Sequence, residues 1–190
     1  DILNNRIIIP HRDENGNLVA IRCRNLDEYM IEIKMKYAPV RIDGKFLSAP
    51  TRMYLYGLYQ NQESIRRMKK VIIFESEKAV LQLNTFLNGN GFAVALSSSN
   101  LHMIQILLLK SFGVEEVIIG LDKEYEEYGS KEEKLYALKI RKSLIDKLKP
   151  YFSVSVMWDT SNLLKKKDSP TDRGKEVFQT LYNNRIEIGE

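Results

Sequence analysis

Apolar and polar positions repeat with two different periods along this chain, and the change of period divides it into two parts. Residues 7–10 form an apolar run and residues 18–24 alternate, and between them lies the turn-forming segment DENGN at 13–17. Two such runs around an Asn-Gly turn predict a β-hairpin. From residue 71 onward, short continuous apolar runs alternate with longer segments in which apolar residues recur every three or four positions, as in strands followed by amphipathic helices.

The second part of the chain predicts an α/β fold. We expect strands at 71–74, 92–96, 117–121 and 152–158, and helices at 79–87, 100–112, 131–148 and 172–183. In the longest of these helices, Leu135, Leu138 and Leu144 have the spacing of an inward-facing stripe. Strands that alternate with helices form a parallel sheet covered on both faces, with right-handed crossovers. We therefore predict a small α+β subdomain at residues 1–70 and a Rossmann-like domain at residues 71–190.

Composition limits the class of protein only loosely. The chain has 190 residues, 44% of them hydrophobic, and a net charge of +4, which favours contact with a polyanion. A single cysteine, Cys23, excludes an internal disulfide and a cysteine-rich zinc site, so we expect a cytoplasmic protein. The longest apolar stretch, at 103–109, is far shorter than the roughly 20 residues that span a bilayer, so we expect no membrane contact. Because the chain begins without methionine, we expect a piece of a longer protein.

Four acidic residues stand at or just beyond the ends of the predicted strands. Glu75 follows the first strand, Asp122 and Glu124 follow the third, and Asp168 follows the fourth. In an open parallel sheet the carboxyl ends of the strands meet at one crevice, so these side chains can become neighbours. Clustered carboxylates repel unless a cation binds them, and their oxygens suit Mg²⁺. The pattern therefore predicts a divalent-metal site, whereas Asp172 is more simply read as the N-cap of the last helix.

Basic and aromatic residues are interleaved in the first part of the chain. In the second strand of the hairpin, Arg22 and Arg24 share a face because side chains alternate with period two, and we expect that face to be exposed. Residues 25–52 carry further basic residues, among them Lys45, between aromatic ones. Such a mixture can bind single-stranded nucleic acid, with the basic side chains on the phosphates and the aromatic rings stacked on the bases. Packing of the aromatic side chains against the main domain explains the pattern equally well.

The order of these features resembles the Toprim domain of primases and topoisomerases. That family has an apolar strand ending in Glu and a later strand ending in Asp-x-Asp, where this chain has Glu75 and Asp122-Lys123-Glu124. The segments RIIIPHRDENGNLVAIRCR, GKFLSAPT, LYGLY and KDSPTDRGKEVF are similar to segments of bacterial, phage and mobile-element DNA primases. The chain departs from the family at Ser76, usually Gly, at Ala79, often Asp, and at Glu124.

The resemblance implies a metal-dependent nucleotidyltransferase, a DNA-directed RNA polymerase that makes short RNA primers on single-stranded DNA. It implies that Asp122, Glu124 and Asp168 hold Mg²⁺ or Mn²⁺ and that Glu75 and Asp122 are catalytic. Template or nucleotide would contact basic residues, namely Arg22, Arg24, Lys45 and Lys78. The implied partners are single-stranded DNA, ribonucleoside triphosphates and a replicative helicase.

Two other functions fit the same residues. A Toprim-fold nuclease would use the carboxylates to activate water, although the basic amino-terminal part argues against it. A non-catalytic nucleic-acid-binding module would retain the fold with a decayed site, which Ser76 and Ala79 favour. The chain has no Gly-x-x-x-x-Gly-Lys-Ser/Thr phosphate loop, which argues against an ATPase or helicase in this segment.

Overall fold

The structure is a computed structural model that describes all residues except 1–4, 34–36, 43, 48–49, 98–99 and 190. The predicted hairpin is present: β1 (Arg6–Arg12) pairs antiparallel with β2 (Leu18–Asn25), and β3 (Tyr37–Pro39) adds to the other edge of β2. In the turn, one oxygen of the Asp13 carboxylate accepts hydrogen bonds from the backbone N–H groups of Asn15 and Asn17, which fixes the reversal.

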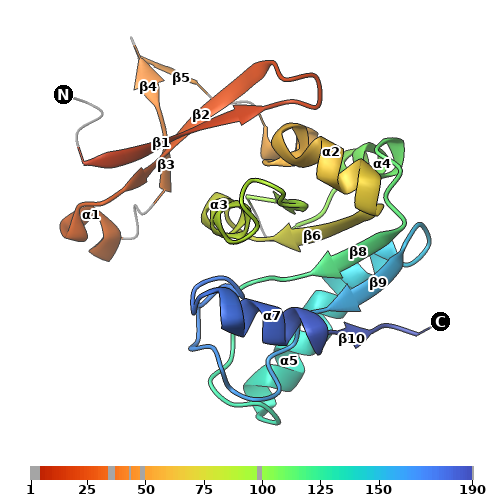
Figure 1. Cartoon of the computed structure of the whole chain (residues 1–190). Coiled ribbons are helices and arrows are strands. Elements are labelled where there is room, and N and C mark those ends of the chain that lie inside the picture. Colours follow the sequence, from red (N-terminus) through yellow and green to blue (C-terminus); the bar gives the residue numbers. More distant parts are fainter. Residues whose placement is uncertain (1–4, 34–36, 43, 48–49, 98–99, 190) are drawn as a thin grey trace.

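The segment after the hairpin leads from this small sheet to the main one (Figure 1). It contains short elements, namely α1 (Glu28–Glu32), β4 (Arg41–Ile42), β5 (Lys45–Phe46) and the 3₁₀ turn η1 (Thr51–Met53). The helix α2 (Leu58–Met68) follows and packs against the first two strands of the main sheet. Just before α2, Tyr56 forms a β-bridge with Ala95, so this connection is pinned to the main sheet.

The main sheet has five strands among the described residues, in the order β10-β9-β8-β6-β7. β6 (Lys70–Phe74), β7 (Ala93–Ala95), β8 (Glu116–Ile119) and β9 (Ser153–Val156) are parallel, as their apolar runs predict. Their apolar side chains are almost completely buried. β10 (Ile186–Glu187) pairs antiparallel with β9 and was not predicted.

Helices cover both faces of this sheet. α3 (Glu77–Phe86) and α7 (Lys175–Asn183) lie together, since the Phe86 and Phe178 rings are 6.3 Å apart. α4 (Met103–Ser111) lies with a long helical segment, in which α5 (Lys131–Ile140), a π-helical turn η2 (Arg141–Ile145) and α6 (Asp146–Leu148) follow without interruption. Lys147 donates a hydrogen bond to the Leu101 carbonyl and joins these two. In the described part of the chain, no helix is long and apolar enough to cross a membrane.

Two predicted helix starts were wrong. α4 begins at Met103 rather than near Asn100, because the Gln105 side chain accepts a hydrogen bond from the backbone N–H of His102, the N-cap residue. α7 begins at Lys175 after Gly174, so Asp172 is not its N-cap. The carboxylate of Asp172 is therefore free of the capping role that we expected.

The strand order places a topological switch point between β6 and β8. The chain runs from β6 outward to β7, then returns past β6 to β8 and continues to β9. In open α/β sheets, the crevice outside the carboxyl ends of strands at such a point is where ligands bind. The residues that follow β6 and β8 are therefore the first place to look for a functional site.

Candidate active site at the carboxyl edge of the main sheet

Glu75, Asp122 and Glu124 lie at the switch point. Burial raises the pKa of Glu75, and the charge of Glu124 raises it further. Burial raises the pKa of Asp122 to about 7, with added contributions from the negative charges of Glu75, Asp172 and Glu124. One oxygen of Asp122 is buried without a hydrogen-bond partner. The three carboxylates are therefore close enough to act on one another's charge, and the prediction that they form one site stays a prediction.

The loop that carries Asp122 is held close to the sheet. A Cβ on Gly120 would lie 2.6 Å from the Met157 methyl group and 3.0 Å from the Phe74 ring, so a larger residue there would displace both side chains. Behind the loop, the Tyr136 hydroxyl donates a 2.7 Å hydrogen bond to the Asp122 carbonyl. Burial and the nearby charges of Glu75, Glu124 and Asp122 raise the pKa of Tyr136. Sequence reasoning missed Tyr136, which had only its helical spacing to indicate that it faces inward.

Basic side chains neutralise the outer acids of this group. Lys78 pairs with Asp172, and Lys167 pairs with Glu124. The Asp168 carboxylate accepts a 2.5 Å contact from Arg173 Nε and a 2.9 Å hydrogen bond from the Lys165 backbone N–H. Asp168 joins the other acids through its backbone carbonyl, which accepts a 2.8 Å hydrogen bond from the Lys123 N–H.

The donor chemistry of this edge fits Mg²⁺ or Mn²⁺, but the ligands are not assembled. Within the described ranges, no three Asp, Glu, His or Cys side chains lie close enough together to form a metal-binding group. Hard carboxylate oxygens are nevertheless the donors that Mg²⁺ prefers. Burial first and the neighbouring carboxylates second disfavour the charged form of Asp122, and a cation bound at its unpartnered oxygen would favour that form. The assignment of Asp122, Glu124 and Asp168 as metal ligands stays a prediction.

The exposed position that we expected for Arg22 was wrong. Its guanidinium contacts the Glu77 carboxylate at 2.5 Å, and only 21% of the Arg22 side chain is exposed. Glu77 is 1% exposed, with His11 Nε2 at 3.2 Å and the Ser97 hydroxyl donating a 2.8 Å hydrogen bond. Burial alone would raise the pKa of Glu77, but these contacts outweigh it and lower the pKa to about 2. Arg22 therefore ties the small sheet to the first turn of α3.

The other predicted basic residues are placed differently from Arg22. Arg24 shares its face of β2, as expected, and donates a 2.7 Å hydrogen bond to the Tyr37 hydroxyl. Lys45 is exposed on β5, next to Phe46, whose side chain is 60% exposed. Lys78 reaches from α3 to the acid group through Asp172. Lys34 and Lys36, which also belong to the basic segment, lie outside the described residues.

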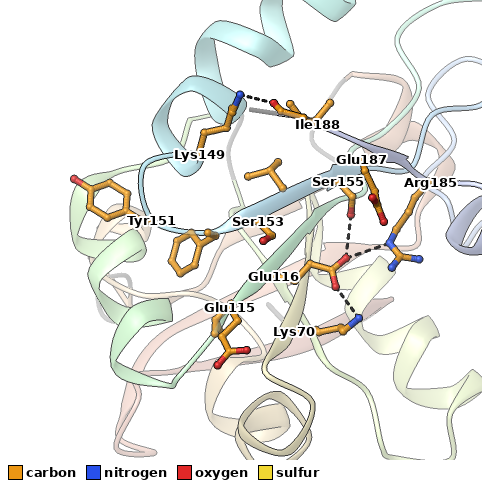
Figure 2. A pocket seen from close by; sticks show the side chains of 14 residues that line it. Lys70, Glu115, Glu116, Lys149, Tyr151, Ser153, Ser155, Arg185, Glu187 and Ile188 are labelled. Carbon is orange, nitrogen blue, oxygen red and sulfur yellow. Dashed lines mark hydrogen bonds and ion pairs between the residues drawn. The ribbon is translucent and has the colours of Figure 1, made fainter.

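A wide pocket of about 810 Å³ lies at the opposite, amino edge of the main sheet (Figure 2). Glu116 lies at its centre and pairs with Lys70 at 2.7 Å and with Arg185 at 3.2 Å. The Ser155 hydroxyl is 3.3 Å from the same carboxylate. The charged groups of this pocket are paired with one another. The pocket also lies at the amino ends of the strands, whereas the switch-point crevice lies at their carboxyl ends. We therefore do not place the active site here.

Comparison with solved structures defines the class of fold: it is that of the catalytic core of DnaG-type primases. The structure of the Aquifex aeolicus primase (zinc-binding and RNA polymerase domains) aligns with this chain with a TM-score of 0.68 and 23% identity. The alignment covers 99% of this chain and 42% of the Aquifex chain. A DnaG primase catalytic domain bound to single-stranded DNA aligns with a TM-score of 0.67 and 20% identity. That alignment covers 96% of this chain and 52% of the DnaG chain. Both likenesses confirm the predicted Toprim α/β fold.

A curated relative comes from a prophage. The SPbeta prophage-derived uncharacterized protein YorJ of Bacillus subtilis (strain 168) is 44% identical over 190 aligned positions, which cover 96% of this chain and 50% of the relative. The chain therefore spans about half the length of this relative. No protein-family model matches the chain.

Proposed function

We propose that this chain is the catalytic core of a primase that synthesises short RNA primers on single-stranded DNA. The observation that carries the proposal is the group formed by Glu75, Asp122 and Glu124 at the switch point of a primase-core fold. The amino-terminal part of the chain supplies the exposed Lys45 and Phe46 on β5 for a template, and a similar catalytic domain has been solved with single-stranded DNA bound.

Each residue of the edge has a role in this reaction. Asp122, Glu124 and Asp168 would hold Mg²⁺, which when bound lowers the pKa of the attacking 3′-hydroxyl and neutralises charge on the triphosphate. Glu75 accepts the proton from that hydroxyl, and burial, which raises its pKa, makes it a stronger base than an exposed carboxylate. Lys167 pairs with Glu124 in this structure and can turn to the triphosphate oxygens once Glu124 binds a cation, and Lys78 is held beside the same edge by its pair with Asp172.

Primer synthesis tests the proposal directly. We expect the protein, incubated with a single-stranded template, ribonucleotides and Mg²⁺, to produce new oligoribonucleotides, and the Glu75→Gln variant to produce none. A shortened template without new RNA would instead identify a nuclease. A replicative helicase partner belongs to the same proposal, and stimulation of synthesis by the helicase would support it.

A non-catalytic nucleic-acid-binding module is the second candidate. The observation that favours it is the state of the acids, which are paired with Lys78, Lys167 and Arg173 rather than assembled around a shared centre. In that case calorimetry would detect no binding of Mn²⁺ to the wild-type protein, while binding to single-stranded DNA would persist.

We expect Lys45 to contribute to template binding through phosphate contact. Binding to single-stranded DNA releases counterions, so the Lys45→Gln variant should reduce the slope of log affinity against log salt by about 0.7. Fluorescence anisotropy of a labelled oligonucleotide at several salt concentrations measures this slope. Lys69, exposed at the amino edge and paired with Glu115, offers the control, since Lys69→Gln should leave the slope unchanged. Equal slopes for wild type and Lys45→Gln would remove Lys45 from the interface.

A further inference from the structure

A buried lysine lies between the two acids of the Asp122-x-Glu124 motif. Lys123 is 3% exposed, and its ammonium group donates hydrogen bonds to Asp159 Oδ2 at 2.9 Å, to Asn162 Oδ1 at 3.2 Å and to the Leu164 carbonyl at 3.0 Å. Three acceptors satisfy the three ammonium hydrogens. The Lys123 side chain is therefore buried with all of its hydrogen-bonding capacity used inside the protein.

Asp159 is equally well held. It is 3% exposed and accepts hydrogen bonds from the backbone N–H groups of Leu163 and Leu164, both at 2.9 Å. Burial alone would raise the pKa of Asp159, but these backbone bonds and the Lys123 ammonium outweigh it and lower the pKa. The Tyr125 hydroxyl donates to the Asp159 carbonyl at 3.1 Å. Asp159 thus organises the loop after β9 around Lys123.

The backbone of Lys123 joins the same two loops a second time. Its N–H donates to the Asp168 carbonyl at 2.8 Å, and its carbonyl accepts from the Lys167 N–H at 2.6 Å. Side chain and backbone of one residue therefore connect the loop that carries Asp122 and Glu124 to the loop that carries Asp168. Lys123 lines a small cavity together with Asp159, whereas Glu124 lines a different one together with Glu75.

Stability alone does not account for this arrangement. Replacing a buried ion pair by apolar side chains of similar size is often neutral or stabilising, so such pairs are better explained by the geometry that they specify. Around Lys123, that geometry is the relative placement of the predicted metal ligands, because Lys123 bonds to the loop after β9 through both its side chain and its backbone.

We propose that Lys123 and Asp159 form a positioning pair that holds the two acidic loops in register and thereby sets the affinity of the site for a divalent cation. This inference rests on the proposed function for the assignment of the ligands, but metal binding tests it without any assay of primer synthesis. The supporting contacts of metal ligands typically change metal affinity by about 10- to 100-fold when they are removed.

The test measures Mn²⁺ affinity by electron paramagnetic resonance, together with urea unfolding. The Lys123→Met variant keeps the length of the side chain and removes its charge, and we expect it to bind Mn²⁺ about 10- to 100-fold more weakly while still folded. The matched control is Lys70→Met, which breaks the ion pair with Glu116 at the opposite edge of the same sheet. The control should change the urea midpoint without changing Mn²⁺ affinity.

A second variant keeps the inference falsifiable if Lys123→Met does not fold. Asp159→Asn retains the size of the side chain and one carbonyl oxygen, and we expect a loss of Mn²⁺ affinity in the same direction. Affinity equal to that of the wild type in either folded variant would overturn the positioning role and leave the proposed function intact. If the wild type itself bound no Mn²⁺, both the positioning role and the metal-dependent function would be overturned.

Discussion

Replacing Asp122 by asparagine is expected to remove metal binding and, at the same time, to stabilise the metal-free protein above neutral pH. The carboxylate is the central acid of the predicted site, so we expect Mn²⁺ affinity to fall by more than about 100-fold, beyond the effect of losing a supporting contact. Primer synthesis should be lost with it. Calorimetric titration with Mn²⁺ at pH 8 measures the first effect.

The stability effect follows from the pKa of Asp122, which is about 7 in the folded protein against an ordinary value of 3.8. Because the folded state holds the proton more tightly, the free energy of unfolding falls as pH rises from about 4 to about 7. Asparagine cannot ionise, so at pH 8 and without metal the variant should be more stable by on the order of 4 kcal/mol. The two proteins should converge near pH 4. A less stable variant at pH 8 would contradict the crowding of charge at this edge.

Replacing Glu77 by alanine is expected to cost about 3–5 kcal/mol of unfolding free energy, because it leaves the partly buried Arg22 and the buried His11 without their carboxylate partner. Glu115→Ala, which breaks the exposed pair with Lys69, should cost less than about 1 kcal/mol and serves as the control. Urea unfolding at pH 7 measures both.

The pH dependence of the Glu77 effect has the opposite sign to that of Asp122. The pKa of Glu77 is lowered from 4.5 to about 2 in the folded protein, so its contribution is present above pH 4.5 and is lost as pH falls toward 2. Hydrogen exchange should also become faster in β1 and β2 of the variant while β6 stays protected. Unchanged exchange in the small sheet would show that Glu77 does not tie the two parts together.

The main sheet could be predicted because apolar runs mark its parallel strands and helical periodicity separates them along the chain. β10 could not, since two paired residues leave no periodic signal. The inward stripe of the long helix was wrong in its first half: Leu135 and Leu138 are 59% and 54% exposed, whereas Tyr136 and Ile140 are buried. The π-helical turn at Arg141–Ile145 shifts the phase of the helix, so a stripe drawn back from Leu144 falls on the wrong residues.

The acids of the candidate site could be predicted because strand topology alone brings them to one edge. Their present partners could not be. The pair between Arg22 and Glu77 joins positions 55 residues apart, and nothing in the local pattern of either marks it as buried. Lys123 and Asp159 are separated by 36 residues and also carry charges that normally indicate the surface. Long-range ion pairs of this kind depend on packing that one sequence does not specify locally.

The strands at the two margins of the main sheet are short, and the apolar strands lie between them, which keeps those apolar strands from pairing with another copy of the chain. β7 has three residues, and on its outer side Tyr56 pairs with Ala95 while the Asn61 amide donates a 2.7 Å hydrogen bond to the Ala93 carbonyl. At the other margin β10 covers β9. Open strand margins are templates for aggregation, and segments such as VIIF and EVII have the composition that favours fibrils. The protein keeps both segments in the interior of the sheet, where no second molecule can extend them.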